Sequence, residues 1–290
     1  MDATLVALVT QLFTGLAVGS LYVLLAVGLA LIFGVLGITN FAHGAFFALG
    51  AYVGLTVLGR TGNFWLALAL APLVVGLLGL AVERGLMQRI AARADVMSLL
   101  LTYGLAIMLV EIIKLVWGKT GYPPTVPAGL QLPVNLGFAY FPAYRLFVIG
   151  LALVVTVAVI LLLERTDWGL IIRAATQDRE MVSLLGVENG RFLGLTFALG
   201  VALAGLAGVA AGPIVGIFPD MGTDILIESF VVVVVGGLGS LRGAIAGGLL
   251  IGLVISFTTL VWPAVSQLSI FILMALVLLF RPQGLLGRAA

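Results

Sequence analysis

The side chains that could do chemistry in the first half of this chain gather around its one histidine. Asn40 and His43 lie in the sequence Asn-Phe-Ala-His-Gly that ends at Gly44, between two long apolar runs. A metal site needs several ligands, and the chain has no second histidine and no cysteine, so no metal site is predicted. A proton relay would need ionisable partners, and none lies between Asp2 and Arg60. Two roles remain: the two side chains bind backbone groups freed at a helix break, which we favour, or they gate or line a path through the protein.

A second glycine-rich interruption lies late in the chain. Gly236, Gly237 and Ser240 belong to the sequence Gly-Gly-Leu-Gly-Ser-Leu-Arg-Gly, whose one charge is Arg242. If the preceding apolar segment ends at the membrane surface, Arg242 is an ordinary cytoplasmic basic residue, which we favour; if the segment is re-entrant, Arg242 lies deeper. Glycine-interrupted apolar segments in both halves of a membrane protein mark a substrate path in folds with repeats. We therefore treat both interruptions as a candidate path or as helix breaks.

Two other groups of polar residues have simpler explanations. Glu111 and Lys114 share one helical face near the end of an apolar run, where an ion pair is favoured over a proton-coupling role. The sequence Gly-Lys-Thr that begins at Gly118 lacks the earlier glycine of a phosphate-binding loop, because Ile113 occupies that position. The chain therefore shows no nucleotide site of its own, and no catalytic cluster of His, Ser, Asp or Glu argues for an enzyme.

The longest polar interval is the stretch 164–191, which lies between apolar segments. It predicts a short amphipathic helix over 177–185, with acidic residues in its first turn, apolar residues at i, i+3 and i+4, and a glycine just after its end. A helix that lies on a membrane surface has a polar face rich in Lys and Arg, whereas this face is mixed and slightly acidic, which favours a protein partner. The residues assigned to this contact are Arg173, Asp178, Glu180, Met181, Leu184, Leu185 and Gly186.

Composition fixes the class of protein to which these residues belong. Hydrophobic residues make up 62% of the 290-residue chain and charged residues only 9%, with a mean hydropathy of +1.29. A soluble fold carries about 25% charged residues and could not cover its surface with so few. Long continuous apolar runs exclude a β-barrel. The sequence therefore predicts one all-helical, multi-pass membrane domain over 1–290, and the net charge of +2 says nothing in favour of nucleic acid binding.

The distribution of Lys and Arg predicts which loops face the cytoplasm. Segments 83–95, 164–191 and 281–290 carry arginines and are expected inside, which places the C-terminus in the cytoplasm. The proline-rich segment 118–144 and the acidic segment 216–228 are expected outside. About eight to ten membrane-spanning helices follow, including broken or re-entrant segments.

The first apolar run, 5–37, is too long for one perpendicular span of about 30 Å and too short for two full spans with a turn. It is expected to be either one long tilted helix or a short helix followed by a full one. Gly15, Gly19 and Ser20 mark the expected position of a break. For the run 225–258, as for 5–37, the sequence leaves open whether the chain crosses the membrane once or twice.

A stripe of small residues is expected to pack one helix closely against another. The stripe consists of residues four apart on one helix face, where small side chains let two backbones approach. Its members are Gly200, Ala204, Gly208 and Gly212.

Three stretches resemble the LivH-type permease subunits of branched-chain amino-acid ABC importers. The run 28–53 contains the Asn-Phe-Ala-His-Gly sequence, which is similar to a signature of that family. The run 173–191 is similar to its cytoplasmic loop, and 231–252 is similar to its late glycine-rich segment. Many relatives carry an acidic residue where this chain has Ala45, so any role of that acid is absent here.

The resemblance implies a fold similar to that of ribose- and vitamin-type ABC importer permeases. It implies a second related permease as partner, in a heterodimer or homodimer, two cytoplasmic ATPase subunits that bind ATP and Mg²⁺, and a periplasmic substrate-binding protein. The stretch 164–191 then resembles the coupling loop that contacts the ATPase, although it lacks the Glu-Ala-Ala pattern of maltose-type permeases. No cofactor is expected on this chain itself.

The sequence therefore predicts a permease in the bacterial inner membrane, surrounded by lipid, that carries branched-chain or other hydrophobic amino acids. One alternative is the same ABC class with urea, amides or aromatic acids as substrate. Another, from a different class, is an ion-coupled secondary carrier, which is disfavoured because paired intramembrane acids and a proton relay are lacking. A channel is the weakest reading.

Overall fold

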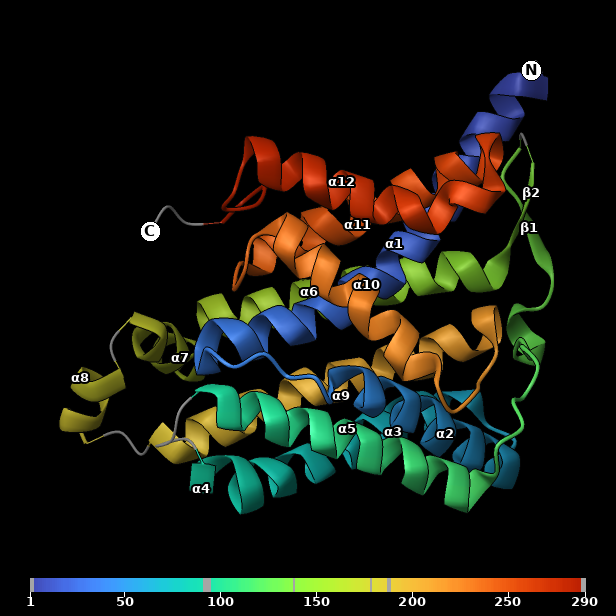
Figure 1. Cartoon of the computed structure of the whole chain (residues 1–290). Coiled ribbons are helices and arrows are strands. Elements are labelled where there is room, and N and C mark those ends of the chain that lie inside the picture. The colour runs from blue at the N-terminus through green and yellow to red at the C-terminus, as the bar shows by residue number, and fades with distance from the viewer. Residues whose placement is uncertain (1–2, 91–94, 138, 178, 187–188, 288–290) are drawn as a thin grey trace.

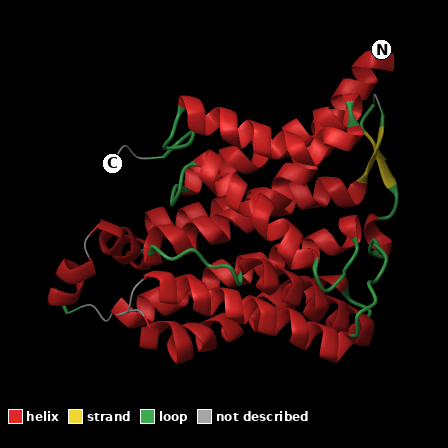
Figure 2. Cartoon of the chain, in the orientation of Figure 1, coloured by secondary structure: helices red, strands yellow, loops and turns green. Residues whose placement is uncertain are grey.

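The computed structural model describes residues 3–90, 95–137, 139–177, 179–186 and 189–287, and this part of the chain is almost entirely helical (Figure 1, Figure 2). Eight of its helices are long and apolar enough to cross a membrane. The predicted all-helical, multi-pass class is thus confirmed. Helix α10 (Met221–Gly236) is shorter and is not one of the eight. The eight spans contain the helices α1 (Ala3–Leu36), α2 (His43–Thr61), α3 (Phe64–Val82), α5 (Asp95–Trp117), α6 (Ala143–Arg165), α9 (Asn189–Val215), α11 (Leu241–Val261) and α12 (Ser266–Phe280).

Short elements connect these helices at the two ends of the bundle. The proline-rich segment forms a small antiparallel hairpin in which Val134 pairs with Phe141, a feature that the sequence did not suggest. The short elements are a π-helical turn (Glu83–Met87), α4 (Gln88–Ile90), a 3₁₀ turn (Ala128–Leu130), β1 (Pro133–Asn135), β2 (Tyr140–Pro142), α7 (Asp167–Gln177), α8 (Arg179–Leu184) and a second 3₁₀ turn (Pro263–Val265).

The helices run between two distinct ends of the molecule (Figure 1). One end, here called the α8 end, carries α4, α7, α8 and the C-terminal segment. The opposite end, here called the hairpin end, carries β1, β2 and the N-terminal end of α1. The two termini therefore lie at opposite ends of the bundle.

Helix α1 is continuous over 34 residues, so the long-helix alternative is correct and no break occurs at Gly15, Gly19 or Ser20. Gly15 and Gly19 instead lie against α11, and Ser20 is buried. A Cβ atom added to Gly19 would meet the backbone of Gly248 and Leu249 at 3.0 Å. At about 1.5 Å per residue the helix is about 51 Å long, so its first turns extend beyond a core of about 30 Å. Leu5, near that free end, is half exposed.

Helix α10 corrects one expectation about the second half of the chain. The acidic segment 216–228 was expected to be an exterior loop, but α10 already begins at Met221. Asp224 therefore lies in the first turn of a helix, where acidic side chains are favoured. Glu228 lies deeper, and its Oε2 accepts a hydrogen bond of 2.6 Å from the Tyr22 hydroxyl of α1. Asp224 and Glu228 therefore belong to the N-terminal half of helix α10 and not to a loop.

The core lies where α1, α2, α9, α10 and α11 pack together. Helix α1 packs against α11, α9 and α6, and α9 packs in turn against α2 and α3. Side chains that are fully buried there include Leu25 and Ile32 of α1 and Phe46 of α2. The outer helices expose apolar residues such as Leu77 of α3 and Leu279 of α12, as expected of surfaces that face lipid.

Candidate functional site

The segment 164–191 contains two helices where the sequence predicted one. Helix α7 ends at Gln177 and α8 begins at Arg179, so the predicted helix over 177–185 is wrong at its start and misses α7 altogether. The reason is Thr166, which starts a helix directly after α6: its hydroxyl accepts a hydrogen bond of 3.1 Å from the Gly169 amide. Asp178 lies outside the described residues, as does the side chain of Glu180.

Helix α7 is firmly attached to the bundle through its buried face, which consists of Gly169, Ile172 and Ala175. Gly169 lies against the backbone of Leu163 in α6, where a Cβ atom would not fit. Its opposite face is exposed. Arg173 lies on that face and lines a shallow surface depression together with Leu170. Helix α7 therefore presents a polar surface from a fixed position.

Helix α8 exposes most of its apolar side chains to solvent. Leu184 and Leu185 are each 76% exposed and Met181 is 54% exposed, whereas Val182 is buried. Gly186 has a φ of 82°, and its amide donates to the Ser183 carbonyl oxygen at 3.0 Å, as expected for a residue that follows a helix end. The apolar edge that the sequence indicated is therefore present on the surface, at the α8 end of the molecule (Figure 1).

The first interruption, here called the α1–α2 break, is the stretch 37–42 between the two helices. Asn40 and His43 are both completely buried. Asn40 Oδ1 accepts a hydrogen bond of 3.0 Å from the Ala42 amide, and His43 Nε2 donates to the Leu25 carbonyl oxygen at 3.0 Å. Among the described residues, Asn40 Nδ2 and His43 Nδ1 have no hydrogen-bond partner. Gly44 follows and lies against the backbone of Gly222, the second residue of α10.

The second interruption, here called the α10–α11 break, is the stretch 237–240. Gly237 follows α10 with a φ of 111°, and Ser240 Oγ accepts a hydrogen bond of 3.1 Å from the Gly243 amide at the start of α11. Gly236 lies against the backbone of Gly243, so the ends of α10 and α11 are in direct backbone contact. Arg242 is 78% exposed, which agrees with a position at the surface rather than within the bundle.

A segment distant in sequence closes the α10–α11 break. The Leu285 amide donates to the Val235 carbonyl oxygen at 2.8 Å, and the Leu286 amide donates to the Gly236 carbonyl oxygen at 2.9 Å. These carbonyl groups end α10 and have no partners within the helix. No sequence signal pointed to this role of the C-terminal segment, because it depends on backbone amides rather than on side chains.

The small-residue stripe of α9 contacts two different helices. Gly200 lies against the Gly28 carbonyl oxygen of α1, whereas Gly208 lies against the Phe47 carbonyl oxygen of α2. Ala204, between them, is completely buried. The fourth member, Gly212, contacts Ile217 beyond the helix and lines a cavity. The stripe therefore places α9 between α1 and α2.

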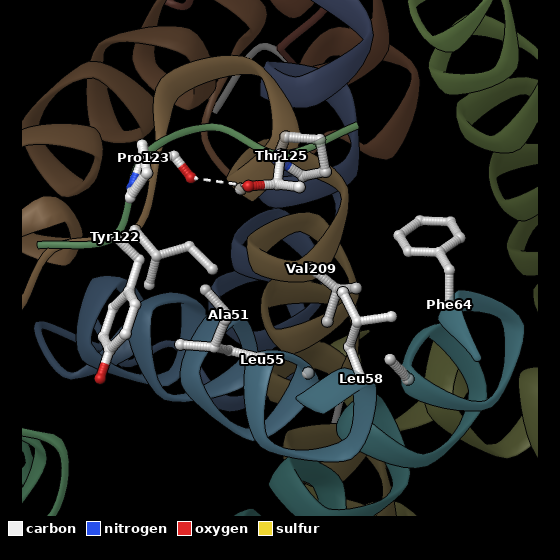
Figure 3. A pocket seen from close by; sticks show the side chains of 13 residues that line it. Ala51, Leu55, Leu58, Phe64, Tyr122, Pro123, Thr125 and Val209 are labelled. Carbon is white, nitrogen blue, oxygen red and sulfur yellow. Dashed lines mark hydrogen bonds between the residues drawn. The ribbon is translucent and has the colours of Figure 1, made fainter. Parts of the chain in front are cut away.

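That cavity has a volume of about 130 Å³ and lies at the hairpin end, between α2, α3, α9 and the segment 122–125 (Figure 3). Apolar side chains such as Leu55, Leu58 and Val209 form most of its wall, and no charged residue lines it. The Thr125 hydroxyl donates to the Pro123 carbonyl oxygen at 3.3 Å instead of pointing to a polar partner in the cavity. Its wall offers no partner for a charged group.

Ion pairs lie at both ends of the bundle. The predicted pair of Lys114 with Glu111, at 3.2 Å, is present at the hairpin end, and Lys114 also binds Asp220 at 3.1 Å. At the other end Arg242 Nη2 lies 2.9 Å from Glu164 Oε1. Neither Asp220 nor Glu164 was foreseen as a partner, because each comes from a distant part of the sequence. Among the described residues, no group of three or more His, Asp or Glu side chains could hold a metal ion.

Two helix breaks in a multi-pass bundle, together with an exposed two-helix segment at one end, characterise the molecule. The chain matches the family model described as "Branched-chain amino acid transport system / permease component" over residues 11–279. It belongs to that family. The resemblance noted in the sequence is thereby confirmed.

Named relatives agree with this assignment. The chain is 31% identical to the "High-affinity branched-chain amino acid transport system permease protein BraD" of Pseudomonas aeruginosa, over 96% of this chain and 95% of that protein. It is 29% identical to the corresponding LivH protein of Escherichia coli K12, with the same coverage, and 28% identical to LivM of that organism, over 92% of this chain and 68% of LivM. A chain of "PsaBC from Streptococcus pneumoniae in complex with Fab" aligns with a TM-score of 0.47 and 14% identity, over 94% of this chain and 88% of that chain.

Proposed function

We propose that this chain is the permease subunit of an ATP-driven importer that carries branched-chain or other hydrophobic amino acids across the inner membrane. The observation that carries the proposal is the family match over residues 11–279, together with relatives whose names include high-affinity branched-chain amino acid transport. Urea, amides or aromatic acids remain the alternative substrates within the same class. An ion-coupled carrier is a weaker alternative, because the family match favours a transport system with several components.

The segment α7–α8 is the proposed contact with the ATPase, which would bind ATP and Mg²⁺ outside this chain. Leu184 and Leu185 are exposed far more than apolar residues outside a membrane usually are, and they follow α7, which is attached to the bundle through its buried face. An exposed apolar edge beside polar residues is typical of a helix that docks in a groove of a partner protein. Arg173, Glu180, Met181 and Gly186 belong to the same proposed surface, as does Asp178.

Charge supports a cytoplasmic position for the α8 end. Arginines there outnumber the basic residues of the hairpin end, and the more basic end of a membrane protein faces the cytoplasm. Those of the α8 end are Arg84, Arg89, Arg165, Arg173, Arg179, Arg191, Arg242 and Arg281, and those of the hairpin end are Arg60, Lys114, Lys119 and Arg145. The C-terminus then lies inside, the N-terminus outside, and the hairpin end would meet the periplasmic binding protein.

A second, related permease is the proposed membrane partner. The chain resembles both LivH and LivM of Escherichia coli K12, two proteins named as permeases of high-affinity branched-chain amino acid transport. A chain with relatives of both kinds suits a pair of similar subunits, as a heterodimer or a homodimer. Lipid would cover the remaining apolar surface. The breaks around Asn40, His43 and Gly44 and around Gly236, Gly237 and Ser240 are proposed to border the path between the two subunits.

A docking test addresses the central claim. Leu184→Glu places a charge on the exposed edge of α8 and should weaken ATPase binding by roughly tenfold or more, as expected for a central apolar contact. The matched control is Leu132→Glu, because Leu132 is 80% exposed at the hairpin end. Binding is measured by co-purification of the ATPase with the permease, and leucine uptake is measured in proteoliposomes with the binding protein.

The results separate the competing functions. Equal ATPase binding by the Leu184→Glu variant and by wild type would contradict the proposed contact. Leucine uptake that continues without ATP or ATPase would favour the secondary carrier. ATP-dependent uptake of urea or amides in preference to leucine would retain the class and change the substrate.

A further inference from the structure

We propose that Glu164 and Arg242 are positioning residues that transmit movement of the α7–α8 segment to the α10–α11 break. This inference rests on the proposed contact between α8 and an ATPase. It adds a physical route by which that contact could reach the membrane core, and it is built from three consecutive contacts.

The first contact joins α7 to the end of α6. Gly169 leaves no space between α7 and the backbone of Leu163, and the Leu170 amide donates to the Thr166 carbonyl oxygen at 3.0 Å. The corner between the two helices is short and doubly hydrogen-bonded, because the Thr166 hydroxyl also accepts from the Gly169 amide. A force on α7 therefore moves the last turn of α6, which carries Glu164, instead of bending a flexible loop.

The second contact joins that last turn to the start of α11. The carboxylate of Glu164 and the guanidinium of Arg242 lie 2.9 Å apart although 78 residues separate them in sequence. Their neighbours Leu163 and Leu241 both pack against one apolar cluster that includes Val159 of α6. An exposed ion pair alone contributes little, but here both helices also pack against the same apolar cluster beside it.

The third contact makes the α10–α11 break respond as a unit. The C-terminal segment binds the last two carbonyl groups of α10 through Leu285 and Leu286, and the Gly284 backbone lies against Gly237. On its other side the break lies against Gly34 of α1, next to the Gly239 carbonyl oxygen. A displacement of Arg242 is therefore passed to α10 rather than lost in a loose turn.

Helix α10 then reaches the candidate path. It contacts α1 through the hydrogen bond from Tyr22 to Glu228, and it contacts the start of α2 through Gly222 and Gly44. The route thus runs from α8 through α7, α6 and α11 to α10, which borders the α1–α2 break. A contiguous chain of packed elements of this kind can carry coupling between distant sites, provided that a coupling measurement supports it.

The test uses the full importer, with ATPases, partner permease and binding protein. ATPase binding is measured in lipid nanodiscs, and the amount of leucine imported per ATP hydrolysed is measured in proteoliposomes. Glu164→Arg and Arg242→Glu each replace attraction with repulsion. Each should lower this ratio about two- to fivefold, the range expected for breaking an exposed pair, while ATPase binding stays unchanged. The double variant, Glu164→Arg with Arg242→Glu, restores attraction and should return the ratio to near the wild-type value.

Two further variants control for a general effect of charge reversal and for failure of a variant to assemble. Arg89→Glu makes the same charge change on an exposed residue of the α8 end, outside the proposed route, and should leave the ratio unchanged. Glu164→Gln removes the charge without repulsion and should give a smaller decrease, so it reports on the pair if a reversal fails to assemble.

Each remaining outcome would overturn the proposal. An unchanged ratio in both single reversals would do so, as would a double variant that stays as low as the singles. Loss of ATPase binding in the single variants would show that the pair acts in docking instead. Failure of the proposed function would be distinct, because the wild-type chain itself would then not bind an ATPase.

Discussion

The α1–α2 break and the α10–α11 break interrupt helices in the same bundle, but different groups satisfy their backbones. At the α1–α2 break, the Asn40 side chain accepts from the Ala42 amide, and His43 at the start of α2 ties it to the Leu25 carbonyl oxygen inside α1. At the α10–α11 break, the amides of Leu285 and Leu286 bind the carbonyl groups that end α10. The first solution is buried and local to the helices, whereas the second comes from the far end of the chain.

The difference follows from where each break lies. Backbone groups that no water can reach must find a partner inside the protein, and each one left without a partner costs several kcal/mol. The end of the α1–α2 break at Asn40 and Ala42 is buried, and the buried His43 that follows it reaches across to α1. The α10–α11 break lies at the α8 end, where the C-terminal segment folds back over it (Figure 1). The first break is therefore stabilised by residues within and next to it, whereas the second also depends on the C-terminal segment.

The largest expected effect concerns what the two breaks share, which is direct backbone contact at a glycine. Gly44→Ala would place a methyl group against Gly222, and Gly236→Ala would place one against Gly243. Each should destabilise the protein by about 3 kcal/mol, the upper part of the usual range for overpacking. The free energy of unfolding in mixed micelles measures this.

A matched control exists on the same helix. Gly59 lies in α2 with open space where a Cβ atom would be, so Gly59→Ala should be neutral or slightly stabilising because alanine favours helices. If the Gly44→Ala variant were as stable as Gly59→Ala, the contact between Gly44 and the Gly222 backbone would not contribute to stability.

Removing His43 tests the side-chain solution. His43→Ala leaves a buried cavity and removes the hydrogen bond that joins α2 to the Leu25 carbonyl oxygen of α1, which should cost about 2–3 kcal/mol. His43→Gln keeps an amide donor and should lose less. The same unfolding measurement applies to both, and an equal loss would mean that volume rather than the hydrogen bond matters at this break.

Removing one backbone donor tests the other solution. Leu286→Pro has no amide hydrogen for the Gly236 carbonyl oxygen and should cost about 1–2 kcal/mol, less than the loss of His43. Leu286→Ala keeps the amide and removes only a side chain that is 52% exposed, so it serves as the control. Equal stability of the two variants would show that the Leu286 amide does not stabilise the α10–α11 break.

The smallest effect is expected at the start of α11. Ser240→Ala removes the hydroxyl that accepts from the Gly243 amide, and loss of such a cap typically costs about 1 kcal/mol. Thermal unfolding followed by tryptophan fluorescence can detect the corresponding decrease in Tm. A decrease as large as that of His43→Ala would show that both breaks depend on side chains after all.

Local sequence patterns identified many of the features near these breaks. The sequence around Asn40 and His43 is polar between apolar runs, and the run from Gly236 to Ser240 is rich in glycine, so both interruptions were visible. The exposed edge of α8 was visible as well, because Leu184 and Leu185 follow Met181 at helical spacing. Patterns of this kind are local, and a helix shows them through its own periodicity.

Features formed by residues far apart in sequence could not be found in this way. Helix α7 was missed because its short apolar face reads as a continuation of the polar stretch, and only its contact with α6 shows why Gly169 is needed. Asp224 and Glu228 read as loop residues because acids are rare in membrane helices; Tyr22 of α1 gives Glu228 a partner that no local pattern contains.

The sequence alone determined the class of the protein, its membrane helices and the polar stretch between them, because an apolar span must be continuous and about as long as the membrane is thick. The tertiary structure decided that α1 is unbroken, that the C-terminal segment closes the α10–α11 break, and that Glu164 meets Arg242. The physical reason is the same in each case. Hydropathy acts on each segment separately, whereas backbone contacts at glycine, hydrogen bonds across helices and ion pairs exist only after distant segments have packed together.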